Sequence, residues 1–264
     1  MNMVTRLGPA HYHALIIANG NYRHLPKLPT SAGDAQDLKQ LLEGRYGFEV
    51  TLLLDATQQQ IGEALYRYQK TLNDADRLLI YFAGYGGVKH VPPPEHTYWA
   101  AVEDQSENIL SWLPAQVISD DIGEIDARHI LLVVDSSFSS ALTHTASTIV
   151  ARANDEQSIR IQWNRKARMV LTSGQDSPVP DADSSNPPHS LFAETLIAIL
   201  RQNDILLSGE MLAHEVSARM ADSAAKLGLK QLPAYADLQD PNHGCGDFFF
   251  VPVTANTQVA SLNP

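Results

Sequence analysis

Residues 77–87 read RLLIYFAGYGG, and residues 130–140 read ILLVVDSSFSS. In each segment, a continuous apolar run passes directly into small or polar residues. Strands that are covered by helices on both faces have such continuous runs, whereas strands with one solvated face alternate. Each segment therefore predicts a buried strand, and the residues after the run lie at its carboxyl end. Ligands bind at that end in open α/β sheets.

Outward from these two segments, strand patterns alternate with helical ones. Ala35, Leu38, Leu41 and Leu42 share a face at helical spacing, and Gly47 is placed to end that helix. The expected strands are 13–18, 48–54, 77–82, 98–102, 130–134, 168–172 and 247–253. The expected helices are 34–46, a helix capped by Asp55 or Thr57 and ending at about residue 72, 114–125, 190–201 and 209–220. This alternation predicts an α/β sandwich around a mainly parallel sheet.

The bulk properties fit one large soluble domain. The chain has 264 residues, of which 44% are hydrophobic, and this supplies a sizeable core. We expect a single domain over residues 1–253. Residues 254–264 are then a polar tail or the start of a linker. The polar stretch 140–166 is expected to be partly a surface loop, and 181–188 is another such stretch.

Charge and cysteine usage exclude several classes of protein. The formal net charge is −11, which disfavours a general nucleic-acid binder and is compatible with cationic peptide partners. A single cysteine, Cys245, allows no internal disulfide and fits a reducing compartment. No apolar run approaches the roughly 18 residues of a membrane helix, and the first ten residues lack a signal-peptide core. The sequence predicts a cytoplasmic protein with no membrane contact.

Several motifs together resemble the caspase-like peptidases, in particular the prokaryotic caspase homologues related to metacaspases, called orthocaspases. They are HALIIANGNY (13–22), YFAGYGG (81–87), VVDSSFSS (133–140), VLTSGQDSPVPD (170–181), HSLFAETL (189–196) and GDFFFVPV (246–253). The resemblance extends over about residues 14–253, and it is specific because of the order and spacing of the motifs. It implies the caspase-haemoglobinase fold, a three-layer α/β/α sandwich.

The chain departs from this family at both catalytic positions. The general-base histidine of the family falls on Tyr85, and the nucleophilic cysteine falls on Ser137. A thiol near pKa 8.5 becomes a thiolate beside histidine, whereas a serine hydroxyl needs a strong, oriented base. A tyrosine hydroxyl is no free base at neutral pH. Loss of either member of such a pair costs on the order of 10⁴ to 10⁶ in turnover, so the resemblance implies an inactive enzyme.

An active hydrolase is the alternative. Ser137 would then be the nucleophile, with specificity for Arg or Lys residues, and its base would be another histidine. His90, His96, His189 and His243 are available, although each also fits a surface or capping role. Cys245 and His243 form a possible second pair, but HGCGDF reads more simply as a turn before the last strand.

The resemblance also implies a substrate pocket for basic residues. In the metacaspase-like branch, an acidic pocket accepts Arg or Lys, and its two carboxylates map onto Asp34 and Asp135. A family serine is replaced by Ala83, and Asp181 is expected nearby. Carboxylates bind a guanidinium through charge-assisted hydrogen bonds. Asp34 also fits a helix N-cap, and Asp135 also fits a strand-end residue that bonds local amides.

These features predict a domain that binds a protein or a basic peptide in a regulatory or scaffolding role. The partner is expected to be an active homologue or another domain of a larger chain. A purely structural domain is a third reading. The sequence predicts no cofactor and no metal, since it contains no calcium-loop pattern. The stretch 140–166 falls where active relatives are often clipped, and a solvated loop is the simpler interpretation.

Overall fold

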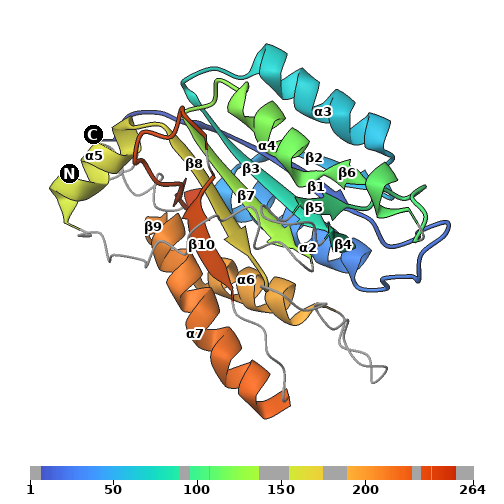
Figure 1. The fold of residues 1–264 in the computed structure, drawn as a ribbon. Helices are drawn as coiled ribbons and strands as arrows, with labels where there is room; N and C mark the ends of the chain where they lie inside the picture. Colours follow the sequence, from blue (N-terminus) through green and yellow to red (C-terminus); the bar gives the residue numbers. More distant parts are fainter. Residues whose placement is uncertain are drawn as a thin grey trace.

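A twisted central sheet with helices on both faces organises the protein (Figure 1). The computed structural model describes residues 7–89, 96–106, 108–136, 155–174, 189–227, 233–238 and 240–253. The main sheet contains six strands in the order β10-β8-β7-β3-β1-β2. They are β1 (His11–Ala18), β2 (Glu49–Leu54), β3 (Asp76–Ala83), β7 (His129–Asp135), β8 (Ala167–Thr172) and β10 (Ala234–Asp237). Five strands run parallel, and β10 pairs antiparallel with β8.

Alternate side chains of the central strands point to opposite faces of the sheet and pack into two separate hydrophobic cores. Ile16 and Leu79 pack in one cluster with α2 (Ser31–Tyr46), α6 (Leu191–Gln202) and α7 (Gly209–Leu227). Leu15 and Leu78 pack in the other cluster with α3 (Gln58–Thr71) and α4 (Ala115–Gly123). Each strand is thus apolar on both faces, which explains the continuous apolar runs of the sequence. The predicted α/β sandwich with a mainly parallel sheet is confirmed.

Smaller elements flank this framework. β4 (Gly86–Lys89), β5 (His96–Trp99) and β6 (Leu113–Pro114) form a separate antiparallel sheet, with the 3₁₀ turn η1 (Ile109–Ser111) nearby. β9 (Leu207–Ser208) pairs with β11 (Phe249–Phe250), and α5 (Glu156–Asn164) lies before β8. One expectation needs correction. The strand expected at 247–253 is reduced to β11 and lies outside the main sheet. The stretch 140–166, which was expected to be partly a surface loop, contains α5.

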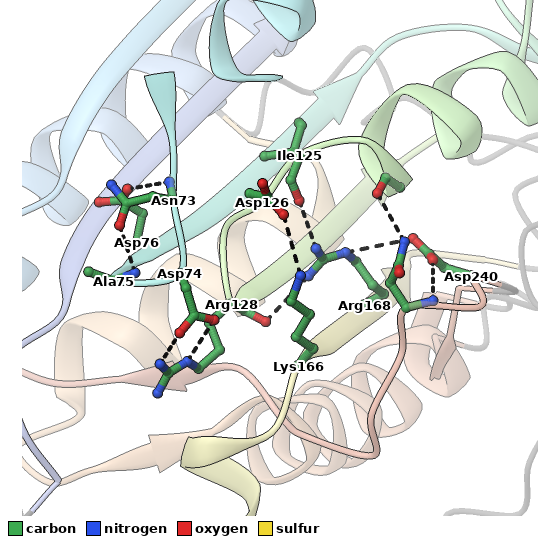
Figure 2. A network of polar contacts seen from close by, with 12 residues as sticks. Asn73, Asp74, Ala75, Asp76, Ile125, Asp126, Arg128, Lys166, Arg168 and Asp240 are labelled. Carbon is green, nitrogen blue, oxygen red and sulfur yellow. Dashed lines mark hydrogen bonds and ion pairs between the residues drawn. The ribbon is translucent and has the colours of Figure 1, made fainter. Parts of the chain in front are cut away.

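Charged residues fasten the amino ends of the strands (Figure 2). Arg168 is fully buried at the start of β8, and its guanidinium donates to the carbonyl of Ile125 over 2.7 Å. Its Nε lies 3.6 Å from the carboxylate of Asp240, whose side chain is 5% exposed. Arg128 pairs with Asp74 in the same network. This end of the sheet is therefore closed by structural ion pairs, which leaves the carboxyl end for a functional site.

Some of the predictions lie outside the described residues. The tail 254–264 is one, so the proposed domain boundary after residue 253 stays a prediction. Within the ranges that the structure describes, every helix is too short or too polar to cross a lipid bilayer.

Candidate functional site

The carboxyl ends of β1, β3 and β7 meet in one place. The parallel register sets Ala83 between Ala18 and Asp135. The Asn19 amide donates to the Ala83 carbonyl over 2.9 Å, and the Gly84 amide donates to the Asp135 carbonyl over 3.4 Å. The strand ends that carried the sequence motifs are therefore neighbours, as expected.

A buried acidic pair lies at this edge. Asp34 comes from α2 and is 1% exposed, and Asp135 ends β7 and is 8% exposed. Ser190 joins the two carboxylates: its amide donates to Asp34 Oδ2 over 3.2 Å, and its hydroxyl donates to Asp135 Oδ2 over 2.6 Å. The hydroxyl of Tyr81 donates to the same Asp135 oxygen over 3.3 Å. The two residues predicted from the family resemblance are thus brought together, but beneath α6 and not in open solvent.

The alternative roles considered for these two residues are only partly met. Helix α2 begins at Ser31 with Thr30 in the N-cap position, so Asp34 lies in the first turn and is not the N-cap. Asp135 does stand at a strand end, but its carboxylate accepts hydrogen bonds from side chains that lie 54 and 55 residues away in the sequence.

His189 is the residue that sequence reasoning undervalued. Its Nδ1 lies 2.7 Å from Asp34 Oδ1, and its Nε2 lies 3.4 Å from Asp37 Oδ2. The sequence offered it only as one of four possible bases or as a surface or capping residue. No local pattern connects residues that are 155 positions apart. The one available signal is that Asp34 and Asp37 share a face at helical spacing.

The electrostatics of the pair follow from its burial. Burial raises the pKa of the Asp34 carboxyl to about 7, and the negative charge of Asp135 adds to the rise. The Ser190 amide and the His189 ring oppose it. Burial also raises the pKa of Tyr81 well above its ordinary value, so this phenol stays neutral and acts as a donor. Two carboxylates in so little solvent require a proton or a cation for balance.

Tyr85 follows the carboxyl end of β3 and lies in an aromatic environment. Its backbone amide donates to the Tyr22 hydroxyl over 2.9 Å, and the two rings are 5.2 Å apart. Its carbonyl accepts from the Ala100 amide over 2.9 Å. Gly84 permits this arrangement, because a Cβ there would lie 2.5 Å from the Tyr22 hydroxyl. The backbone of Tyr85 is therefore fixed on both sides, and its ring packs on a cluster centred on Tyr22 and Trp112.

The remaining predicted residues are distributed as follows. Ser137, Asp181 and His90 lie outside the described residues, and Ser136, the last described position before Ser137, is buried. His96 is exposed at the start of β5. His243 accepts a hydrogen bond from the Arg168 amide over 3.1 Å, which places it near the opposite end of the sheet. It therefore cannot serve as a base at the carboxyl edge.

Comparison with known proteins identifies the family. The sequence profile of the caspase domain matches residues 11–241. The chain belongs to the caspase-domain family. Mucosa-associated lymphoid tissue lymphoma translocation protein 1 of Homo sapiens is 37% identical over 73 residues, which is 28% of this chain and 9% of that protein. The chain thus spans only a small part of that relative's length.

A solved structure supports the fold of this caspase domain. The crystal structure of protein GSU0716 from Geobacter sulfurreducens superimposes with a TM-score of 0.60. The superposition covers 89% of this chain and 99% of the chain of GSU0716, and the two sequences are 17% identical. At that identity the likeness concerns the fold alone.

The acidic pair of the caspase domain is held by side-chain and backbone donors, and the His189 ring contacts Asp34. Among the described residues, no group of three or more histidine, cysteine or acidic side chains gathers to hold a metal ion.

Proposed function

We propose that this caspase-family domain is catalytically inactive and binds basic peptide segments of a protein partner without cleaving them. The observation that carries the proposal is the packing of Tyr85, to which the family resemblance assigns the position of the base. Its backbone is fixed by Tyr22 and Ala100, and its ring packs on Tyr22. A packed phenol in this position cannot take a proton from Ser137 at neutral pH.

A hydrolase that uses Ser137 is the second candidate, and one observation favours it. The 2.7 Å contact between His189 Nδ1 and Asp34 resembles the way a carboxylate orients the histidine of a catalytic triad. In a triad, however, the second ring nitrogen must keep a free lone pair for the nucleophile. Here Nε2 faces Asp37 at 3.4 Å. This nitrogen is therefore engaged by a carboxylate and is not free in the way that a triad requires.

The binding half of the proposal rests on the acidic pair. Asp34 and Asp135 are both present and adjacent through Ser190, as a pocket for a guanidinium or an ammonium group requires. The formal charge of −11 also favours the approach of cationic peptides. Ala83 has no hydroxyl to offer at its position, so recognition depends on the carboxylates.

Two assays on the purified domain test the proposal. The first follows the hydrolysis of Arg and Lys peptide amides, with and without calcium, and we expect no turnover. The second measures the binding of an arginine-terminated peptide by calorimetry. We expect the peptide to bind about tenfold more weakly to Asp135→Asn than to the parent domain. This corresponds to a loss of about 1.4 kcal/mol in binding free energy.

The matched control is Asp126→Asn, which removes a carboxylate that is 78% exposed and pairs with Lys166. This variant should bind like the parent protein. Turnover that disappears in Ser137→Ala would overturn the inactive assignment, and equal binding by Asp135→Asn and the parent would overturn the acidic pocket.

A further inference from the structure

The acidic pair already has partners from the protein's own chain. Both oxygens of Asp34 are used by the segment that opens α6, one by His189 Nδ1 at 2.7 Å and the other by the Ser190 amide at 3.2 Å. Asp135 Oδ2 accepts the Ser190 hydroxyl at 2.6 Å. The segment His189–Ser190 therefore sits where the basic group of a peptide would have to bind.

Only one of these partners carries charge. Ser190 and Tyr81 supply neutral donors, whereas the His189 ring can be protonated. The titratable groups that face this ring are Asp34 and Asp37 from α2, and Asp135 and Tyr81 lie behind Asp34. Among the described residues, these facing groups are acidic or neutral, so the ring is directed at negative charge.

The contacts of His189 direct both of its ring nitrogens at carboxylates. A neutral imidazole donates from one nitrogen and accepts at the other. Its accepting nitrogen would then point a lone pair at a carboxylate, either Asp34 or Asp37. The imidazolium donates from both nitrogens and satisfies both carboxylates.

We infer that His189 is the built-in counter-ion of the acidic pair, and that a basic peptide side chain binds by displacing it. The inference rests on the proposed peptide-binding function. It adds that the peptide must compete with the His189 ring for the acidic pair. Burial raises the pKa of Asp34 and the His189 ring opposes that rise, so the contact with His189 favours the carboxylate form.

The position of His189 makes displacement feasible. Its side chain is 19% exposed, against 1% for Asp34 and 6% for Ser190. It precedes α6, whose first helical residue is Leu191. The ring therefore lies between solvent and Asp34, and it can rotate away while Ser190 keeps the helix capped.

A binding experiment with two peptides tests this competition. Short peptides that end in arginine or in citrulline, its neutral isostere, are titrated at pH 7 into the parent domain, His189→Ala, His189→Gln and His214→Ala. His214 is an exposed histidine on α7 and serves as the matched control. We expect the arginine peptide to bind about tenfold tighter to His189→Ala than to the parent. We also expect a smaller gain in His189→Gln, no gain in His214→Ala and no gain for citrulline.

The outcomes separate this inference from the proposed function. Arginine-peptide affinities that are equal in the parent and both His189 variants overturn the competition while leaving peptide binding in place. A gain that citrulline shares would mean that the ring blocks by size alone, and it overturns the counter-ion role. Binding to none of the four proteins overturns the peptide-binding function and the competition with it. His189→Gln keeps a neutral donor for Asp34. It can therefore replace His189→Ala in the binding test if that variant does not fold.

Discussion

At the scale of single residues, Ser190 has the largest number of roles. Its amide and hydroxyl join Asp34 to Asp135, and its hydroxyl also accepts from the Ala193 amide over 2.9 Å as the N-cap of α6. One side chain thereby fixes the start of a helix and the geometry of a buried pair of acids. Helix capping and site formation depend on the same atom.

This double role predicts an unusually costly capping mutation. Ser190→Ala removes the cap and leaves Asp135 without a donor that lies 2.6 Å away. We expect it to lower the free energy of unfolding by about 2 to 3 kcal/mol, more than the ~1 kcal/mol of an ordinary N-cap. Urea denaturation followed by circular dichroism measures the loss.

Thr57→Ala is the matched control for this prediction. Thr57 caps α3 through a capping box with Gln60 in an exposed position and contacts no buried acid. It should cost about 1 kcal/mol. Equal losses in the two variants would contradict the view that Ser190 stabilises the acidic pair as well as the helix.

At the scale of elements, the two ends of the main sheet have different tasks. Charged side chains anchor the amino ends of β3, β7 and β8, and Arg168 donates to the carbonyls of Arg128 and Ile125 in this network (Figure 2). Arg168 also donates to the carbonyl of Ala167. The carboxyl ends carry the acidic pair and Tyr85. Stabilising contacts and the candidate site are thus separated by the length of the strands.

The amino-end network predicts a large effect for one buried arginine. Arg168→Leu removes donors from three carbonyls and leaves Asp240 buried without its counter-charge. We expect a loss of about 3 to 5 kcal/mol in the free energy of unfolding. The exposed pair of Arg160 and Glu156 provides the comparison, because Arg160→Ala should cost at most about 0.5 kcal/mol. Similar losses in both variants, measured by chemical denaturation, would show that the buried network is not stabilising.

The elements that the sequence predicted well are those in which local pattern and burial agree. β1, β3 and β7 are apolar on both faces, and the cap of α3 at Thr57 is encoded within four residues. Several short elements were missed, among them β10 and α5. β10 reads AYAD and becomes a strand only by pairing with β8. α5 lies in a polar stretch that was expected to be partly loop, although Ile159 and Trp163 have helical spacing and are buried.

The site shows the same division between local and distant information. Asp34, Asp135 and Tyr85 were found because motifs aligned them with a known family. His189 was not assigned, because its partner Asp34 is 155 residues away and nothing local marks an ion pair between the start of one helix and the first turn of another. Such contacts arise only when α6 packs against α2, and local patterns in a single sequence do not predict them.

At the scale of the whole molecule, the two cores make the sheet a rigid partition. The layer of α2, α6 and α7 lies on one face, and α3 and α4 lie on the other (Figure 1). A buried polar group affects the stability of the whole fold, because charging it in the folded state is unfavourable. His129 is the clearest case, since it is fully buried and near the rings of Trp163 and Phe249.

His129 predicts part of the acid sensitivity of the fold. Burial lowers its pKa well below the ordinary value, and the positive charge of Arg77 adds to the effect. Above about pH 6.5 the ring is neutral in the folded and unfolded states and contributes nothing to pH dependence. Below that pH, His129 binds a proton in the unfolded chain but not in the folded protein. The free energy of unfolding therefore falls by up to about 1.4 kcal/mol per pH unit as the pH decreases.

The variant His129→Leu isolates this contribution. Asp34 acts in the opposite direction, because its raised pKa lets the folded state take up a proton first, and this effect is common to parent and variant. We expect His129→Leu to lose about 2 kcal/mol less than the parent between pH 6.5 and pH 5. Denaturant midpoints across this range measure the difference, and His214→Gln, an exposed histidine, should follow the parent. Parallel curves for His129→Leu and the parent would contradict the prediction.

The long separation between Asp34 and its partner also has a consequence during protein synthesis. A ribosome makes Asp34 155 residues before His189, an interval on the order of ten seconds at typical elongation rates. Asp135 is translated within that interval, so the nascent chain carries both acids before their internal cation exists. This edge of the sheet is therefore completed only after the start of α6 has been translated.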